Sequence, residues 1–237
     1  SAPAAGNPSP GTAVYLNMTS TKKTTSLIRL RNALIALLAL FLLLFGYYQL
    51  WFLRQPERVA PMDDTVFVSP ANGEVAAVAA WDRERLQLEK DLGVIEVLTR
   101  DIGPRGSLIS IEMDVTNVHY QRAPIAGRFL EAAYRPGEFR NALIRTNEYG
   151  FRLENEHNAM LFETADGLKY KVVQIAGLVA RRIVDYVEPN QPVDQGEVIG
   201  LIKLGSQVTL ILPEGVQPLV QPGQKVVDGE TVVAEIK

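Results

Sequence analysis

The chain has 237 residues, a formal net charge of −3 and a sequence pI of about 5.5. This acidic balance provides no basic excess for nucleic acid, and we expect no such partner. Cysteine is absent, which excludes disulfides, thiolate chemistry and cysteine-type zinc sites. His119 and His157 are the only histidines, so we expect no metal centre and assign any imidazole chemistry to one of these two.

The N-terminal part of the chain predicts a tail followed by a membrane anchor. Residues 1–26 are rich in Ser, Thr, Pro, Ala and Gly, a composition typical of disorder. Within residues 27–53, the uncharged run 33–53 would span about 30 Å as a helix, the hydrocarbon thickness of a bilayer. Tyr47, Tyr48 and Trp51 fit an aromatic belt at its end. A cleaved signal peptide is the alternative, but the run exceeds a normal apolar core and no small-residue cleavage site follows it.

Residues 54–237 predict a soluble domain made mostly of short strands. Apolar runs at 66–68, 74–78, 108–111 and 172–175 indicate strands, and the turn sequence 69–73 (SPANG) separates the first two. Residues 82–92 have the composition of a short helix.

An internal repeat refines the expected fold class. Residues 191–202 and 224–236 each combine a valine, an acidic residue, a Gly-Glu turn and an apolar strand. Gly196 and Gly229 are expected to adopt positive φ in these turns. Such paired half-motifs resemble the flattened sandwich of lipoyl and biotinyl carrier domains. We therefore predict a mainly β, lipoyl or barrel-sandwich-like domain with an internal hammerhead repeat, preceded by one transmembrane helix.

This architecture leaves a non-catalytic alternative open. A membrane anchor joined to lipoyl-like repeats also describes the membrane adaptor subunits of efflux and secretion systems. An adaptor would carry a long heptad-patterned helical hairpin, which this sequence lacks. A true lipoyl domain needs a lysine at its hairpin tip, whereas Lys203 lies within an apolar run and the segment between the repeats contains Gly205-Ser206.

Several short motifs point to a different function. Gly205-Ser206 lies downstream of His119, and together with other motifs it resembles the phosphatidylserine decarboxylase family over about residues 54–237. The matching stretches are residues 69–73 (SPANG), 118–119 (VH), 122–124 (RAP) with Gly127, 134–137 (YRPG), 155–158 (NEHN), 174–177 (QIAG), 180–183 (ARRI) and 204–206 (LGS).

The resemblance implies that the chain cuts itself between Gly205 and Ser206. In such a mechanism Ser206 Oγ attacks the Gly205 carbonyl and converts the amide to an ester. β-Elimination then frees the Gly205 carboxylate, and hydrolysis of the dehydroalanine at 206 takes up one water and releases ammonia, which leaves a covalent pyruvoyl group. This cofactor is an electron sink for the carbanion that decarboxylation leaves at Cα. The products would be a β chain of residues 1–205 and an α chain of residues 206–237.

His119 is the expected base for this reaction, because an imidazole can accept the serine proton near neutral pH. The alternative is a structural histidine at a strand edge. His157 stands where the resemblance leads us to expect arginine, and we interpret it as structural or peripheral.

Asn72 departs from the family pattern, in which the aspartate of Ser-Pro-Ala-Asp-Gly orients the histidine. Asparagine cannot stabilise an imidazolium in the same way. Three interpretations remain open. Slow cleavage suffices for a single event per molecule; Asn72, which precedes Gly73, deamidates to aspartate; or the protein stays uncut, as an inactive homologue or because Asn72 is an engineered block.

Arg122 and Arg181 are the candidate substrate-binding residues. A guanidinium can bind a lipid phosphate or a carboxylate as a fork. A solvated surface position is the alternative for Arg122. Strand alternation places only one of Arg181 and Arg182 inward.

Together these features predict a carboxy-lyase that converts phosphatidylserine, or an ether-lipid analogue, to the ethanolamine lipid and CO2. We expect a single-pass anchor in the cell membrane, with the catalytic domain on the cytoplasmic face and a possible homodimer that covers sheet edges. The alternatives are the membrane adaptor and an uncut, inactive family member.

Overall fold

The computed structural model describes residues 10–84, 93–137, 156–177, 182–203 and 206–237. The chain divides into two compact units, residues 1–51 and residues 52–237.

The first unit is helical. Helix α1 (Pro10–Tyr47) continues into one turn of π-helix, η1 (Tyr48–Phe52), whose last residue belongs to the second unit. The stretch Leu27–Phe52 has a mean hydropathy of 2.2 and is long and apolar enough to cross a membrane, in agreement with the expected anchor.

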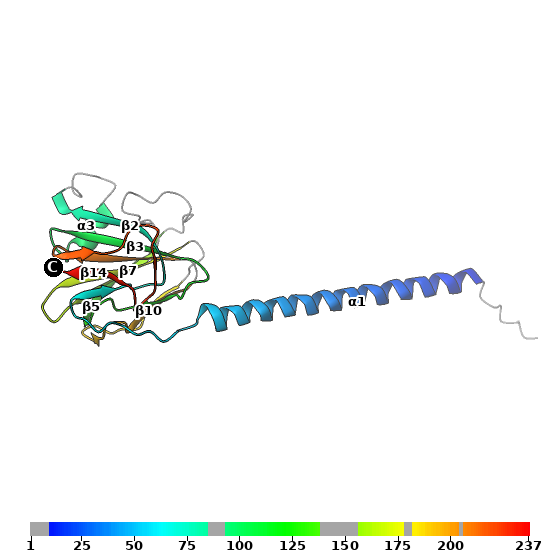
Figure 1. Ribbon diagram of the computed structural model, residues 1–237. Helices are drawn as coiled ribbons and strands as arrows, with labels where there is room; N and C mark the ends of the chain where they lie inside the picture. Colours follow the sequence, from blue (N-terminus) through cyan, green and yellow to red (C-terminus); the bar gives the residue numbers. More distant parts are fainter. Residues whose placement is uncertain (1–9, 85–92, 138–155, 178–181, 204–205) are drawn as a thin grey trace, which may run out of the picture. The chain divides into compact units, whose positions relative to one another are not determined.

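The helix begins earlier than the sequence predicts. Helix α1 starts at Pro10, so residues 10–26 of the expected tail are helical in the structure (Figure 1), while residues 1–9 lie outside the described residues. Proline is well accommodated in a first helical turn because the amide donor that it lacks would be unsatisfied there. Once the apolar helix has formed, each added residue contributes one hydrogen bond, which favours extension into the Ser- and Thr-rich segment.

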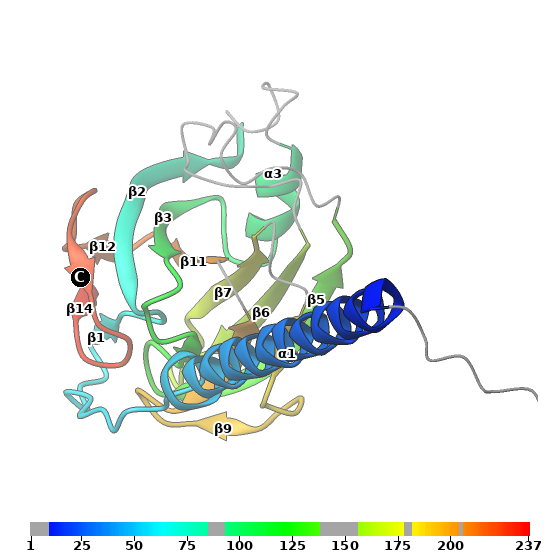
Figure 2. The same ribbon diagram turned by 90° about the vertical axis from the view of Figure 1, so that its right-hand side faces the viewer.

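The second unit is built on one curled, antiparallel sheet of eight strands, visible in Figure 2. Its order is β13-β2-β3-β11-β7-β6-β5-β9. The strands are β2 (Gly73–Asp82), β3 (Arg105–Met113), β5 (Gly127–Arg135), β6 (His157–Glu163), β7 (Lys169–Ala176), β9 (Pro192–Val193), β11 (Ser206–Pro213) and β13 (Lys225–Val226). The predicted strands at 74–78, 108–111 and 172–175 are confirmed within β2, β3 and β7.

Two smaller sheets complete the domain, in the orders β1-β14-β12 and β4-β10-β8. Their strands are β1 (Val66–Val68), β4 (Tyr120–Arg122), β8 (Arg182–Asp185), β10 (Val198–Lys203), β12 (Val216–Pro218) and β14 (Val232–Ile236). The main core lies among these sheets. Within it Tyr170 stacks on Phe162 and meets Phe67 edge-on, and its hydroxyl donates to the Ile125 carbonyl at 3.1 Å.

A second apolar cluster packs against another part of the large sheet. Helix α3 (Gly93–Thr99) contributes Ile95 and Leu98, which are buried together with Trp81. Of the predicted helix at 82–92, Asp82 is the last residue of β2 and Arg83 and Glu84 are helical as predicted, while residues 85–92 lie outside the described residues.

The two repeat turns confirm the expected hammerhead geometry. Gly196 has φ 82° and Gly229 has φ 72°, values that favour glycine. The turns lie against one another, since a Cβ on Gly229 would stand 3.6 Å from Gly196 Cα. The same Cβ would approach Arg122 Cδ to 2.8 Å. The predicted mainly β class with an internal hammerhead repeat therefore describes the domain.

Gly229→Ala should destabilise the domain more than Gly215→Ala. Both glycines have positive φ, so each substitution carries about 1–2 kcal/mol of left-handed backbone strain. Nothing lies within 4 Å of a Cβ on Gly215, whereas at Gly229 the added atom meets Arg122, whose guanidinium is held by several partners. Thermal unfolding of the detergent-solubilised full chain should show the larger fall in Tm for Gly229→Ala, and equal falls would contradict this packing.

Candidate active site

A tight loop between β3 and β4 positions His119. The Asp114 carboxylate accepts hydrogen bonds from the Thr116 amide at 2.7 Å and the Thr116 hydroxyl at 2.6 Å. The Asn117 side-chain oxygen accepts the Asp114 amide at 2.7 Å. The Thr116 hydroxyl bond is the main cause that holds the pKa of Asp114 below its usual value. These local hydrogen bonds fix the backbone of residues 114–117, which precede His119.

The His119 imidazole is fully buried, and its contacts define its tautomer. Nδ1 lies 3.0 Å from the Asn117 carbonyl oxygen, which can only accept, so the contact assigns the proton of the neutral ring to Nδ1. Nε2 then carries the lone pair, and within the described part of the chain it has no hydrogen-bond partner. The ring of Phe52 packs on the imidazole with centroids 4.1 Å apart. His119 is therefore arranged as a neutral base with one accepting nitrogen.

Burial is the main cause that lowers the pKa of His119, to about 4. The Asn117 carbonyl and the Asp114 charge act in the opposite direction, and the Arg54 charge adds to the lowering. The imidazole is consequently neutral at physiological pH.

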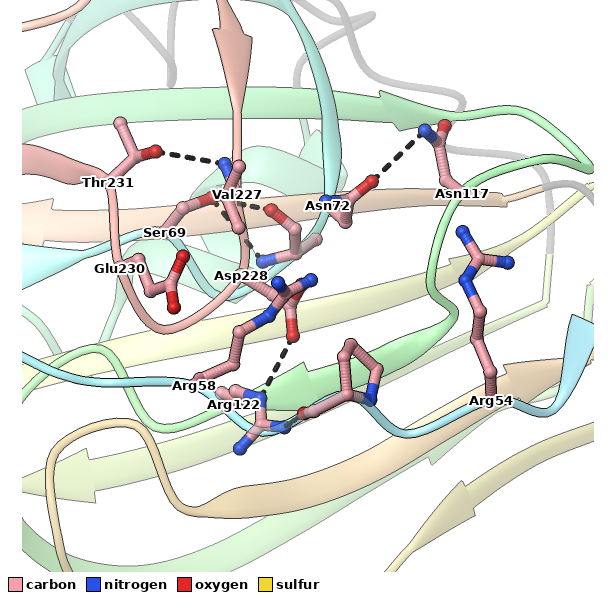
Figure 3. Close-up of polar contacts among 12 residues, drawn as sticks. Arg54, Arg58, Ser69, Asn72, Asn117, Arg122, Val227, Asp228, Glu230 and Thr231 are labelled. Carbon is pink, nitrogen blue, oxygen red and sulfur yellow. Dashed lines mark hydrogen bonds and ion pairs between the residues drawn. The ribbon is translucent and has the colours of Figure 1, made fainter. Parts of the chain in front are cut away.

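Among the described residues, no hydrogen bond joins Asn72 to His119. Its side-chain oxygen accepts a hydrogen bond from Asn117 Nδ2 at 3.1 Å, as Figure 3 shows. The nitrogen that an aspartate would be expected to orient, Nδ1, is occupied by the Asn117 carbonyl instead. Asn72 thus supports the residue that holds the imidazole, one step removed from the ring.

Ser206 begins strand β11 beside this loop. Its backbone is paired with Met113, at the end of β3, and with Ala176, at the end of β7. The His119 carbonyl accepts a hydrogen bond from the Ile202 amide at 3.2 Å, so His119 flanks the strand that leads to Ser206. Gly205 lies outside the described residues, and so does Arg181.

Arg122 is engaged inside the protein. Its Nε donates to the Asp228 carboxylate at 2.9 Å, and its two terminal nitrogens donate to the Gly196 and Pro56 carbonyls at 2.8 and 2.9 Å. Only 7% of the residue is exposed, so the alternative of a solvated surface arginine is wrong. A lipid carboxylate or phosphate could reach this guanidinium only by displacing one of these partners. Substrate binding by Arg122 stays a prediction that its contacts do not support.

Arg122, Arg58 and Asp228 form a buried group that we call the Asp228 ion cluster (Figure 3). The Asp228 side chain is fully buried, and Arg58 donates to its second oxygen from Nη2 at 2.7 Å and from Nε at 3.2 Å. Both carboxylate oxygens are therefore paired with a guanidinium, the condition under which a buried charge is tolerated.

Sequence reasoning missed three residues that the structure brings to this region. Asn117 directly precedes the motif at 118–119, but no sequence signal marks its carbonyl as the partner of His119. Phe52 directly follows the aromatic cluster at the end of the apolar run, and this position in the sequence is a signal that could have drawn attention to it. Asp228 occupies the acidic position of the second repeat, yet its counterpart Asp194 is exposed, so the repeat pattern alone could not single it out.

His157, expected to be structural or peripheral, is buried at the start of β6.

Comparisons with known proteins identify the family of the chain. The family model described as phosphatidylserine decarboxylase matches residues 45–234. A phosphatidylserine decarboxylase proenzyme of Ruegeria pomeroyi is 43% identical over 188 residues, covering 79% of this chain and 78% of the relative. A proenzyme of the same name from Nitrobacter winogradskyi is 40% identical over 187 residues, 78% of this chain and 69% of the relative. The chain belongs to the phosphatidylserine decarboxylase family, a family of carboxy-lyases.

The depressed pKa of His119 should be visible as a pH dependence of stability. Between about pH 4 and 6.5 the unfolded chain binds a proton at His119 that the folded chain does not. This histidine should therefore make stability fall as pH drops through that window, by about 1.4 kcal/mol per pH unit, and should contribute no slope above it. Urea unfolding of Ser206→Ala measures the slope, and adding His119→Gln should remove this part of it. An identical slope in the two proteins would contradict the assignment.

Disruption of the Asp228 ion cluster should be costly. Arg122→Met leaves one buried carboxylate oxygen without its guanidinium and removes a donor from the buried Gly196 carbonyl and the part-buried Pro56 carbonyl, so we expect a loss of about 3–5 kcal/mol. The control is Arg128→Met, because Arg128 is half exposed and its nitrogen lies 3.9 Å from Glu163, an arrangement worth at most about 1 kcal/mol. Denaturant unfolding of the full chain compares the two, and similar losses would show that the cluster contributes little.

Proposed function

We propose that this protein is a self-processing phosphatidylserine decarboxylase, in which His119 is the base and Ser206 becomes the pyruvoyl group. The observation that carries the proposal is the neutral, buried His119, whose Nε2 accepts no hydrogen bond from the described residues and which flanks the strand leading to Ser206. Family membership and the proenzyme names of the relatives support the same reading.

The residues present fit the formation of a pyruvoyl group. A serine preceded by glycine stands at the start of β11, and a buried imidazole with an accepting nitrogen belongs to the same region. His119 Nε2 would take the hydroxyl proton of Ser206 as Oγ attacks the Gly205 carbonyl. The Asn117 carbonyl would hold Nδ1–H through this transfer and favour the imidazolium that forms.

The pyruvoyl group, once formed, supplies a carbonyl that delocalises the electron pair left when the substrate loses CO2. The surrounding residues would then orient the head group and exchange protons. His119 is suited to that exchange because its protonated nitrogen is already engaged and its second nitrogen is available. The cytoplasmic orientation and a homodimer stay predictions.

This arrangement bears on the three interpretations of Asn72. The tautomer of His119 is held by a backbone carbonyl, which asparagine at position 72 leaves in place. We therefore favour cleavage without prior conversion of Asn72 to aspartate. An uncut, inactive family member is the second candidate, since Asn72 adds no negative charge to stabilise an imidazolium.

The intact mass of the purified protein under denaturing conditions tests the proposal. We expect two chains, residues 1–205 and residues 206–237, with the shorter one blocked by a pyruvoyl group. Ser206→Ala should remain one chain, and His119→Gln should slow cleavage by about 10²-fold or more. A wild-type chain that stays intact on long incubation, and that Asn72→Asp does not convert to the cleaved form, would overturn the proposal.

Asn72→Ala should cleave within about tenfold of the wild-type rate, because the Asn117 carbonyl still holds Nδ1 and a lost neutral hydrogen bond is worth about 1 kcal/mol. Asn72→Asp should cleave at least as fast as the wild type, since a carboxylate can accept the same Asn117 donor and adds a favourable charge. Time courses of the two fragments by gel densitometry give both rates. Loss of cleavage in Asn72→Ala would show that Asn72 acts directly.

A further inference from the structure

Phe52 behaves differently from the residues that precede it. Leu50 and Trp51 are 81% and 50% exposed, whereas Phe52, the last residue of the apolar stretch, is only 1% exposed. Its ring covers one face of the His119 imidazole, with an interplanar angle of 34°. The end of the anchor stretch is thus also part of the packing around the proposed base.

The chain that follows Phe52 is fixed along its length although it forms no regular helix or strand. We call residues 52–61 the juxtamembrane segment. Arg54 donates to the Thr116 carbonyl at 2.7 Å, and Thr116 belongs to the loop that positions His119. The Pro56 carbonyl accepts from Arg122 at 2.9 Å. The segment is therefore attached to β4 and to the His119 loop.

The C-terminal part of the chain holds the same segment. Arg58 donates to Asp228, and the Val59 amide donates to Glu230 Oε1 at 3.2 Å. Asp228 and Glu230 follow the proposed cleavage site, so after cleavage they would belong to residues 206–237. The juxtamembrane segment would then be held by both chains of the mature protein.

We propose that Phe52 is a positioning residue for His119, and that the juxtamembrane segment presents Phe52 to the imidazole through its attachment to the Asp228 ion cluster. The proposal rests on the proposed role of His119 as the base. Two aromatic faces in contact restrict rotation of the imidazole and keep water from that face. His119 is then oriented by the hydrogen bond at Nδ1 and by the Phe52 ring on its face. These two contacts fix the plane of the imidazole and therefore the direction of the Nε2 lone pair.

Both the charges and the desolvation that act on the imidazole are known, so the direction in which losing Phe52 shifts the pKa of His119 can be predicted. Arg54, on the juxtamembrane segment, disfavours the imidazolium, and Asp114, on the His119 loop, favours it. Removing the Phe52 ring admits water, which reduces the desolvation that is the largest cause of the lowered pKa. The pKa of His119 should therefore rise from about 4 toward its ordinary value of 6.5.

The test uses the full-length chain in detergent, without a histidine tag, so that only His119 and His157 give imidazole signals in carbon-labelled NMR spectra. In the uncleavable Ser206→Ala background, Phe52→Ala should raise the pKa of His119 and leave His157 unchanged. Phe52→Leu, which keeps an apolar side chain, should give a smaller rise. The control is Val59→Ala, in the same segment and 83% exposed, which should titrate like the parent.

The second readout is the rate of self-cleavage in the same variants with Ser206 restored. We expect Phe52→Ala to slow cleavage by about tenfold or more, Arg58→Gln to slow it to a smaller extent, and Val59→Ala to stay within about twofold. An unchanged His119 titration or an unchanged cleavage rate in Phe52→Ala, with the His157 signal native, overturns the proposal. If His119→Gln cleaves at the wild-type rate, the base assignment fails, whereas the Phe52→Ala titration still reports whether the ring packing exists.

Discussion

The domain depends on one buried charge interaction, between the Arg122 guanidinium and the Asp228 carboxylate. A buried carboxylate must be paired, and a buried guanidinium must place each nitrogen on an acceptor. Arg122, on β4, meets this requirement with three acceptors. They are the Asp228 carboxylate in the second repeat turn, the Gly196 carbonyl in the first repeat turn and the Pro56 carbonyl. Four segments that are distant in sequence are thereby held at one point. The two repeats are related by sequence, yet Asp228 of the second is buried in this ion pair whereas Asp194 of the first is exposed, so the two half-motifs differ in structure.

The environment of His119, the proposed base, depends on exclusion of water as much as on hydrogen bonding. Burial keeps His119 neutral, the Asn117 carbonyl selects its tautomer, and Phe52 closes one face. A backbone carbonyl carries no formal charge, so it orients the ring without strongly favouring the imidazolium. This combination suits a base that must accept a proton once during maturation, where a modest rate is sufficient. It also explains how asparagine can occupy position 72 without leaving the imidazole unsupported.

Much of the fold could be predicted from the sequence because its signals are local. The apolar run 33–53, the strands at 108–111 and 172–175 and the positive φ of Gly196 and Gly229 each follow from the residues in a short window. The motif resemblance singled out His119 and Ser206 as candidates for the same reason, and their roles stay predictions. The contacts of Arg122, Asp228 and Phe52 could not be predicted, because each partner is more than 60 residues away and is chosen by tertiary packing. Asn117 escaped notice because its backbone, rather than its side chain, contacts His119.

The place of β11 within the large sheet has a consequence for the lifetime of the protein. Because β11 is hydrogen-bonded to β3 on one side and to β7 on the other, a cut before Ser206 would leave two chains interleaved within one sheet. Before such a cut the protein would fold as a single chain, with β11 covalently tethered to the rest of the sheet. The cleaved form, once unfolded, would have to reassemble by a second-order encounter that depends on concentration, while the exposed strand edges of the separated chains favour aggregation. Maturation would then make folding a one-way event, and heat inactivation of the mature form would be governed by its unfolding rate rather than by an equilibrium.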